Sequence, residues 1–235
     1  MSQLIPPKFE SPDAKLRAVG AMFDRVAPRY DAANRAMTLG LDLRWRRRLL
    51  RELALAPGAR VLDLACGTGD FLRLLAEEGA APIGLDLSGR MLREVPPHFD
   101  RVQAAGESLP FRDESFDAVV TGFAVRNFAS PEAVFSEVAR VLRPGGALGI
   151  IEVATPHWRP ARAVHAWYFQ RVAPIIGWVV GRDREAYRYL PASVAFLPEP
   201  FAFARMLVER DFLPPKRMLV GMGASQLLVT HKRHG

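Results

Sequence analysis

Short apolar runs alternate with helical stretches in the middle of the chain, and this alternation predicts a parallel sheet with crossover helices. We predict strands at residues 60–64, 81–85, 102–105, 116–121 and 147–153, and helices at about 70–78, 89–94 and 131–142. Ser130-Pro131 supplies an N-cap and a first-turn proline for the last of these helices. The run Arg143-Pro144-Gly145-Gly146 is expected to end it and turn the chain into the next strand.

The two flanks of this segment are different in pattern. Residues 1 to about 57 have helical spacing, which predicts a helical cover that ends at Pro57-Gly58. Residues 58–235 form the second unit, with a helical insertion at about 156–198. A helix is predicted at 199–210, and two apolar runs at 217–220 and 226–230 predict an antiparallel hairpin at a sheet edge.

The stretch from Trp158 to Val180 is aromatic and apolar, with interspersed arginines and Pro174. Two interpretations stay open. One is an amphipathic lid that rests on a membrane, and the other is a core-packing helix with a solvated outer face.

Composition narrows the class of protein. The 235 residues contain one cysteine, Cys66, which excludes a disulfide scaffold. No uncharged apolar window reaches the roughly 18 residues of a spanning helix, and the N-terminus lacks the apolar core of a secretion signal. We therefore expect a cytoplasmic globular protein.

The net charge of +7 is unevenly distributed along the chain. Residues 1–57 carry +5, residues 58–153 carry −5, and residues 154–235 carry +7. An acidic centre makes nucleic acid an unfavoured partner, whereas basic flanks suit an anionic membrane surface.

A glycine turn between a strand and a helix is the most informative segment, Val61 to Asp70. Gly67 and Gly69 permit positive φ and let a ligand approach the backbone at the carboxyl end of a strand. A dinucleotide fingerprint requires a third glycine where this chain has Leu72. Asp86 ends the next strand, where a carboxylate can accept hydrogen bonds from both ribose hydroxyls.

The segment Asp63-Leu64-Ala65-Cys66-Gly67-Thr68-Gly69 resembles the glycine loop of class I S-adenosylmethionine-dependent methyltransferases, with Ala65 in place of the first glycine. Residues 103–117 resemble the adenine-binding loop and fourth strand of the same enzymes. The resemblance implies an α/β, Rossmann-like seven-stranded sheet with an antiparallel last strand, helical additions at the N-terminus and after the fifth strand, and S-adenosylmethionine as cofactor. The cofactor-binding residues that it implies are Asp63, Gly67, Thr68, Gly69, Asp86, Leu87, Ala105, Gly106 and Gly122.

Four further stretches resemble the quinone-ring C-methyltransferases of menaquinone and ubiquinone biosynthesis. They are Tyr30-Asp31-x-x-Asn34 with Gly40 and Trp45, Phe123-x-x-Arg126-Asn127-Phe128, Arg140 to Gly146 with Glu152, and Tyr187-x-Tyr189-Leu190-Pro191-x-Ser193-Val194 with Pro198. The resemblance covers almost the whole chain. It implies C-methylation of a prenylated hydroquinone, with demethylmenaquinol expected in preference to the ubiquinone precursor.

Several positions depart from that family's pattern. Ala33, Thr38 and Asp42 stand where the family usually has Met, Ser and His. Ala105-Gly106 replaces an Asn-Ala or Asp-Ala pair and removes the usual side-chain contact to the adenine amine; Glu107 or backbone groups are the alternatives. Gly122 replaces a frequent serine.

Four residues are candidates for the chemistry of methyl transfer. Arg126 is expected to stabilise the phenolate that makes the ring carbon nucleophilic, or else to be a solvated loop arginine. Asn127 orients the quinol oxygen or caps a turn. Tyr30 and Asp31 reach the pocket if the N-terminal helices fold over it, although Asp31 also suits a helix cap. Tyr187 and Tyr189 suit either the quinol pocket or the core.

The remaining expectations concern binding partners and alternative functions. The substrate is a prenylated quinol, and peripheral contact with the inner face of a membrane is compatible with it, as is a homodimer. Five scattered histidines predict no metal site, and Cys66 lacks the neighbours of a catalytic nucleophile. The rival functions are a methyltransferase for RNA or another small molecule, and a protein that binds the cofactor without catalysis.

Overall fold

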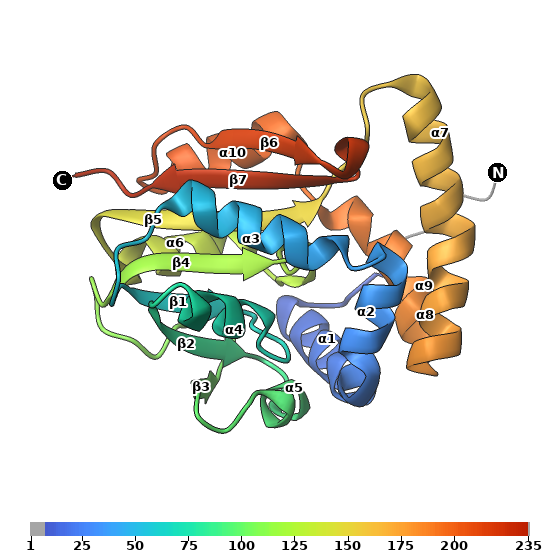
Figure 1. The fold of residues 1–235 in the computed structure, drawn as a ribbon, viewed down its shortest axis with the longest axis horizontal. Helices are drawn as coiled ribbons and strands as arrows, with labels where there is room; N and C mark the ends of the chain where they lie inside the picture. Colours follow the sequence, from blue (N-terminus) through green and yellow to red (C-terminus); the bar gives the residue numbers. More distant parts are fainter. Residues whose placement is uncertain (1–7, 235) are drawn as a thin grey trace.

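A seven-stranded sheet forms the centre of the molecule in the computed structural model, which describes residues 8–234 (Figure 1). The strands are β1 (Arg60–Leu64), β2 (Ala81–Asp86), β3 (Asp100–Gln103), β4 (Phe116–Gly122), β5 (Leu142–Val153), β6 (Lys216–Val220) and β7 (Ser225–His231). Their spatial order is β3-β2-β1-β4-β5-β7-β6. Strands β1 to β5 pair in parallel, while β7 pairs antiparallel with β5 and with β6. The predicted α/β sheet with a reversed strand and a terminal hairpin is confirmed.

Ten α-helices occur among the described residues. They are α1 (Pro12–Val26), α2 (Tyr30–Thr38), α3 (Leu41–Leu53), α4 (Asp70–Glu77), α5 (Gly89–Glu94), α6 (Pro131–Val141), α7 (Arg159–Trp167), α8 (Ala173–Gly181), α9 (Arg184–Ser193) and α10 (Pro200–Val208). No helix among residues 8–234 is both long and apolar enough to cross a membrane. The first seven residues, on which the expectation about secretion partly rests, lie outside the described residues.

The bounds of two strands were predicted wrongly: β3 lies two residues earlier than predicted, and β5 begins five residues earlier. β3 ends at Gln103 because the chain leaves the sheet before Ala104 and Ala105 and turns toward the ligand-binding edge. β5 begins at Leu142, directly after α6, and the predicted turn at Pro144 to Gly146 lies inside the strand. This segment forms an irregularity opposite Phe116 to Ala118, because Pro144 has no N–H to donate and Gly145 takes a φ of +74°.

Helices cover both faces of the sheet. On one face, α3 and α4 bury Leu49 and Phe71 against Val120 of β4. On the other face, α6 and α10 bury Phe135 and Phe203, whose ring centroids lie 5.7 Å apart. Each helix therefore turns one apolar stripe to the sheet, as an amphipathic period predicts.

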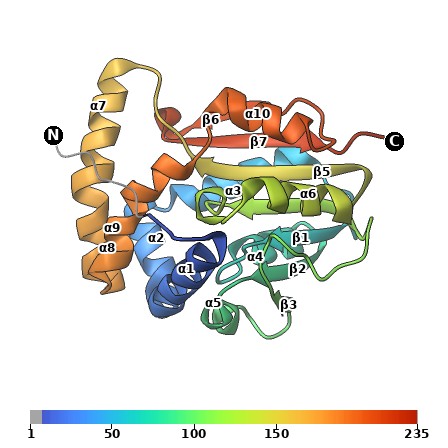
Figure 2. The ribbon, with the colours of Figure 1, turned by 180° about the vertical axis from the view of Figure 1, so that it is seen from behind.

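A separate layer of helices lies beyond the carboxyl ends of the parallel strands, where α1, α2, α8 and α9 gather (Figure 2). Tyr187 of α9 is buried in this layer among residues of α1 and α2. Its ring lies directly against Gly177 and Gly181 of α8, where an added Cβ would stand 2.1 Å and 2.3 Å from ring atoms. The absence of side chains at Gly177 and Gly181 thus leaves room for the Tyr187 ring, and this ring packs α9 closely against α8.

The aromatic stretch that allowed two interpretations forms α7, a π-helical segment (Tyr168–Val172) and α8. Ala173, Gly177 and Gly181 are buried, whereas Trp158, Trp167 and Val179 are exposed. It packs on α2 and α9 with one side, as a core-packing helix does, and its outer side is largely apolar. The contact with a membrane stays a prediction. The division of the chain at residue 57 stays a prediction.

Candidate active site

The glycine turn after β1 is held by the acid at the end of β2. The N–H of Gly67 donates to Asp86 Oδ2 at 2.8 Å, and the N–H of Ser88 donates to Oδ1 at 2.8 Å. Gly67 and Ala65 have φ values of +56° and +57°, so the turn is tight even where a Cβ is present. Burial raises the pKa of Asp86, while the backbone N–H groups of Ser88 and Gly67 act in the opposite direction.

A first cavity opens over the ends of β1, β2 and β4. Six predicted ligand-binding residues line it, namely Gly67, Asp86, Leu87, Ala105, Gly106 and Gly122. Tyr30 and Asn127 line it as well, together with Phe23 of α1 and Glu107. Glu107 Oε1 accepts the N–H of Ala129 at 2.8 Å, so part of this carboxylate supports the loop after β4.

A small second cavity adjoins the first beneath the glycine turn, and Asp63 and Thr68 line it together with Arg46. Desolvation raises the pKa of Asp63 to about 8, although the nearby Arg46 lowers it in part. Asp63 Oδ2 and Arg46 Nε are buried and have no hydrogen-bond partner among residues 8–234. Buried polar atoms of this kind are rare in folded proteins, and they suit a ligand with polar groups of its own.

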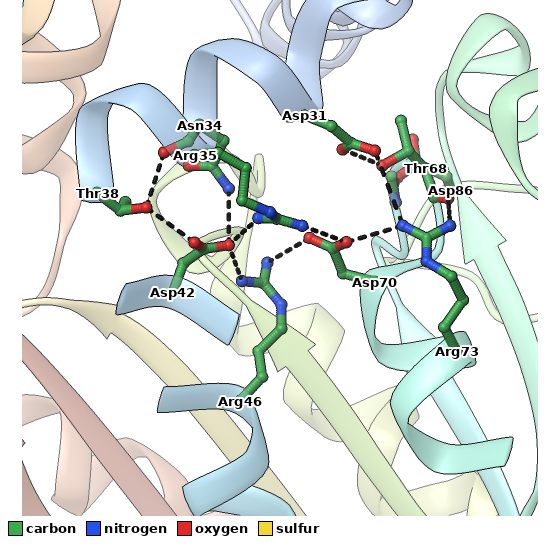
Figure 3. A network of polar contacts seen from close by, with 11 residues as sticks. Asp31, Asn34, Arg35, Thr38, Asp42, Arg46, Thr68, Asp70, Arg73 and Asp86 are labelled. Carbon is green, nitrogen blue, oxygen red and sulfur yellow. Dashed lines mark hydrogen bonds and ion pairs between the residues drawn. The ribbon is translucent and has the colours of Figure 1, made fainter. Parts of the chain in front are cut away.

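Three predicted site residues do not line these two cavities: Arg126, which belongs to a third cavity described below, Gly69 and Asp31. Gly69 caps α4 with a φ of +89° and packs near Leu72 and Val95. Asp31 accepts a hydrogen bond from Thr68 Oγ1 at 2.5 Å and lies 3.7 Å from Arg73 (Figure 3). Asp31 is thus close to the glycine turn and supports it from α2.

An ion network joins the N-terminal helices to the glycine turn (Figure 3). Asp42 is fully buried; it pairs with Arg35 and accepts from Arg46 Nη1 at 3.1 Å and from Thr38 Oγ1 at 2.8 Å. Arg35 Nη2 also donates to Asp70 Oδ1 at 2.5 Å, at the first residue of α4. These contacts attach α2 and α3 to the start of α4.

Sequence reasoning missed this network. The available signal was the four-residue spacing from Asp42 to Arg46, which places these two side chains on neighbouring turns of α3. Thr38 ends α2, so its contact with Asp42 crosses a break between two helices and had no helical signal. Thr38 and Asp42 are two of the positions that depart from the family pattern. The contact of Arg35 with Asp70 had no local signal, because 35 residues separate them.

A third, larger cavity of about 440 Å³ lies between the N-terminal helices, the end of β4 and α7 to α9. Its wall is mainly apolar and aromatic, and includes Met37, Tyr168, Phe169, Tyr187 and Leu190. Four residues line both this cavity and the first one: Phe23, Tyr30, Phe123 and Asn127. The two cavities therefore meet at the end of β4, where Phe123 has a φ of +59°.

Arg126 lies in the wall of the large cavity and is only 6% exposed. It pairs with the fully buried Glu152 of β5, donates to the carbonyl of Phe123 at 2.8 Å, and donates through Nε to Ser193 Oγ at 3.2 Å. The interpretation of Arg126 as a solvated loop arginine is therefore wrong. It presents a fixed cation in an apolar wall.

Three tyrosines, Tyr30, Tyr187 and Tyr189, line the large cavity near Asn127. Tyr189 Oη donates to Asn127 Oδ1 at 3.2 Å, which orients the amide of Asn127 toward the cavity wall. Burial raises the pKa of Tyr30, Tyr187 and Tyr189, so all three phenols stay protonated near neutral pH.

Among residues 8–234 no group of three or more His, Cys, Asp or Glu side chains could hold a metal ion.

A sheet whose last strand alone is reversed, together with a glycine turn held by an acidic side chain, is typical of one enzyme class, the class I S-adenosylmethionine-dependent methyltransferases. A methyltransferase of known structure from Thermotoga maritima aligns with a TM-score of 0.65 at 17% identity, covering 91% of this chain and 99% of that one. The ubiE/COQ5 methyltransferase family model matches residues 11–225, and the chain belongs to this family.

Relatives with curated names support the assignment over the full length. A demethylmenaquinone methyltransferase from Roseiflexus sp. (strain RS-1) is 40% identical over 238 residues, which covers 98% of each chain. One of the same name from Thermus thermophilus is 42% identical over 203 residues and covers 81% of this chain and 91% of its own.

Proposed function

We propose that this protein methylates a ring carbon of a prenylated hydroquinone, and that demethylmenaquinol is its substrate. The observation that carries this proposal is the junction of the two cavities at Tyr30, Phe123 and Asn127. A cavity that holds a ribose-binding acid, Asp86, meets there a larger apolar cavity with room for a quinone ring and part of its tail. The names of the full-length relatives favour demethylmenaquinol as the ring.

The first two cavities fit S-adenosylmethionine, which supplies an activated methyl group on a sulfonium when it is bound. Asp86 keeps free acceptor positions for ribose hydroxyls after it has accepted from Gly67 and Ser88. The unpartnered oxygen of Asp63 suits an ammonium group, and Arg46 in the same cavity suits a carboxylate. Leu87, Ala105 and Gly106 would flank the adenine, and Gly122 leaves space at the end of β4.

Arg126 would stabilise the substrate phenolate in this reaction. A ring carbon becomes nucleophilic when the neighbouring hydroxyl loses its proton, and a fixed cation in an apolar wall favours that loss. Glu152 and Ser193 hold the guanidinium in place, so little reorganisation is needed when the negative charge develops. Arg126 therefore acts as an electrostatic catalyst.

Asn127 and Tyr30 would align the ring with the methyl group. Asn127 is held by Tyr189 and lines both cavities; its amide nitrogen donates one N–H to the carbonyl of Phe123 at 3.5 Å, and the second N–H can donate to a quinol oxygen. Tyr30 also lines both cavities and covers the junction from α2, which keeps water from the reacting atoms. Asp31 would act as a positioning residue that supports Thr68 and the glycine turn from α2.

Because the proposed substrate has a lipid tail, the proposal includes peripheral contact of the protein with the inner face of the cytoplasmic membrane. Trp167, Ile175 and Trp178 are exposed on α7 and α8, next to the large cavity. No acidic residue occurs between Glu152 and Asp183, while four arginines do. Exposed aromatic side chains beside arginines favour an anionic lipid surface. A homodimer stays a prediction that light scattering can test.

Incubation of the purified protein with methyl-labelled cofactor and a reduced, short-tailed demethylmenaquinone tests the proposal. We expect label in the quinol ring, and label transfer to the oxidised quinone should be absent because it has no phenol to ionise. A ubiquinone precursor and an RNA serve as parallel acceptors, since one relative carries a ubiquinone/menaquinone name. Cofactor binding without label transfer to any quinol would refute the proposal.

A further inference from the structure

A groove on the surface adjoins the mouth of the large cavity, where α3, the tip of the β6–β7 hairpin and the connection from β5 to α7 meet (Figure 1). We call it the basic groove. It is lined by Leu41, Arg44, Trp45, Arg48, Arg51, His157, Trp158 and Leu219 to Gly223. Leu41, Trp45, Gly221 and Met222 belong to the walls of both the basic groove and the large cavity. The groove and the cavity mouth thus form one continuous surface.

Little of the charge of the basic groove is offset by the protein. The pKa of Glu52 is lowered chiefly by its hydrogen bond with Lys216. The nearby charges of Arg48 and Arg51 help to lower it, but Glu52 forms no ion pair with either arginine. Arg44, Arg48 and Arg51 follow one side of α3, are exposed, and form no ion pair with any other residue in the 8–234 range. The lining contains no acidic side chain, and the nearby Glu52 is bound to Lys216 at 2.8 Å. Three unpaired cations on one exposed helix face suit an anionic partner.

Large apolar side chains surround these arginines and the mouth. Trp158 is 70% exposed, Met222 is 88% exposed, and Leu39 on the other side of the mouth is 81% exposed. Such exposure is costly in water, and tryptophan beside arginine is typical of the headgroup level of a bilayer.

We propose that the basic groove binds the anionic headgroups of a phospholipid membrane and turns the mouth of the large cavity toward the lipid hydrocarbon. The arginines would contact lipid phosphates while Trp158, Met222 and Leu39 enter the interface. The proposal rests on the proposed function, because a lipid-tailed quinol gives the cavity a reason to open there. An RNA matches this surface less well: Trp158 offers a stacking surface for bases, whereas the exposed Met222, Leu39 and Leu219 beside it do not.

Co-sedimentation with phospholipid vesicles tests this assignment on the full chain. One set of vesicles is pure phosphatidylcholine, and the other is an equimolar mixture with phosphatidylglycerol. The test variant is R44Q/R48Q/R51Q. A matched control, R90Q/R93Q/R112Q, removes the same charge from exposed side chains of α5 and of the connection from β3 to β4.

We expect the protein to bind the anionic vesicles in a salt-sensitive manner. R44Q/R48Q/R51Q should bind them on the order of a hundredfold more weakly, at about fivefold per arginine, whereas the control variant should bind nearly as the natural sequence does. Equal losses in both triple variants, an unchanged affinity of R44Q/R48Q/R51Q, or no binding of the natural sequence would each overturn the proposal.

Turnover of a soluble, short-tailed quinol without vesicles separates this proposal from the proposed function. If the natural sequence sediments with anionic vesicles but does not methylate that quinol, the proposed function fails and the docking surface stands. If it methylates the quinol but does not sediment, the docking surface fails alone.

Discussion

Removal of the charge on Arg126 tests the proposed mechanism most directly. The structure buries Arg126 at 6% exposure against the fully buried Glu152, and Arg126 lines the large cavity but not the cofactor cavity. Arg126→Met should therefore leave the dissociation constant for S-adenosylmethionine unchanged. It should lower kcat by roughly 10²- to 10³-fold, as loss of one oxyanion-stabilising group does.

A stability loss would complicate that result, because Arg126→Met leaves the Glu152 carboxylate buried without its partner. Breaking a buried pair in this way costs about 3–5 kcal/mol. The double variant Arg126→Met/Glu152→Gln removes both charges and should regain much of the lost free energy of unfolding. Its kcat should nevertheless stay low, since the phenolate still lacks a cation.

The assays are urea unfolding for stability, calorimetry for the cofactor and label transfer for kcat. Arg205→Met serves as the matched control, because Arg205 pairs with Glu209 on the exposed surface of α10 at 3.5 Å. An exposed pair contributes about 0–1 kcal/mol, so this variant should behave as the natural sequence does. A double variant that regains both stability and turnover would refute a catalytic role for Arg126.

Three further predictions concern the cofactor site and its surroundings. Asp63 has a pKa of about 8, so about nine-tenths of molecules hold a proton there near pH 7. Cofactor binding should release this proton, as calorimetry in buffers of different ionisation enthalpy measures, and Asp63→Asn should abolish the release. In the cofactor-free protein the free energy of unfolding should fall as the pH rises from about 4 to about 8, because over this range the unfolded chain has released the Asp63 proton and the folded protein still holds it; the Asn variant should lose that slope in urea titrations. Asp42→Ala removes the buried carboxylate that Arg35 and Arg46 share and leaves Arg46 only its longer contact with Asp70, at 3.8 Å, so it should cost about 3 kcal/mol, or roughly 6–12 °C in Tm; an unchanged Tm would contradict the network. Gly177→Ala places a Cβ 2.1 Å from the Tyr187 ring and should raise KM for the quinol without changing cofactor affinity.

Local patterns in the sequence determined the sheet, most of its strands and the glycine turn. Gly67 and Asp86 each come at or just after the end of an apolar run that predicts a strand. A parallel sheet brings the carboxyl ends of its strands to one edge, so the sequence alone indicates that these two residues lie close together. The resemblance to a family then connected the turn with a cofactor. The limits of β3 and β5 were missed because pairing with neighbouring strands, rather than composition, decides where a strand begins and ends.

Only the tertiary structure decided how the flanks complete the site. Arg126 and Glu152 stand 26 residues apart, and Thr68 and Asp31 stand 37 apart, so no local period relates them. The buried network around Asp42 and the basic groove likewise join elements that the chain separates. Charged side chains gain their roles from burial and from partners brought together by packing, and these depend on the whole fold. The sequence determined which elements form; their packing determined which charges are buried, paired or left free for a ligand.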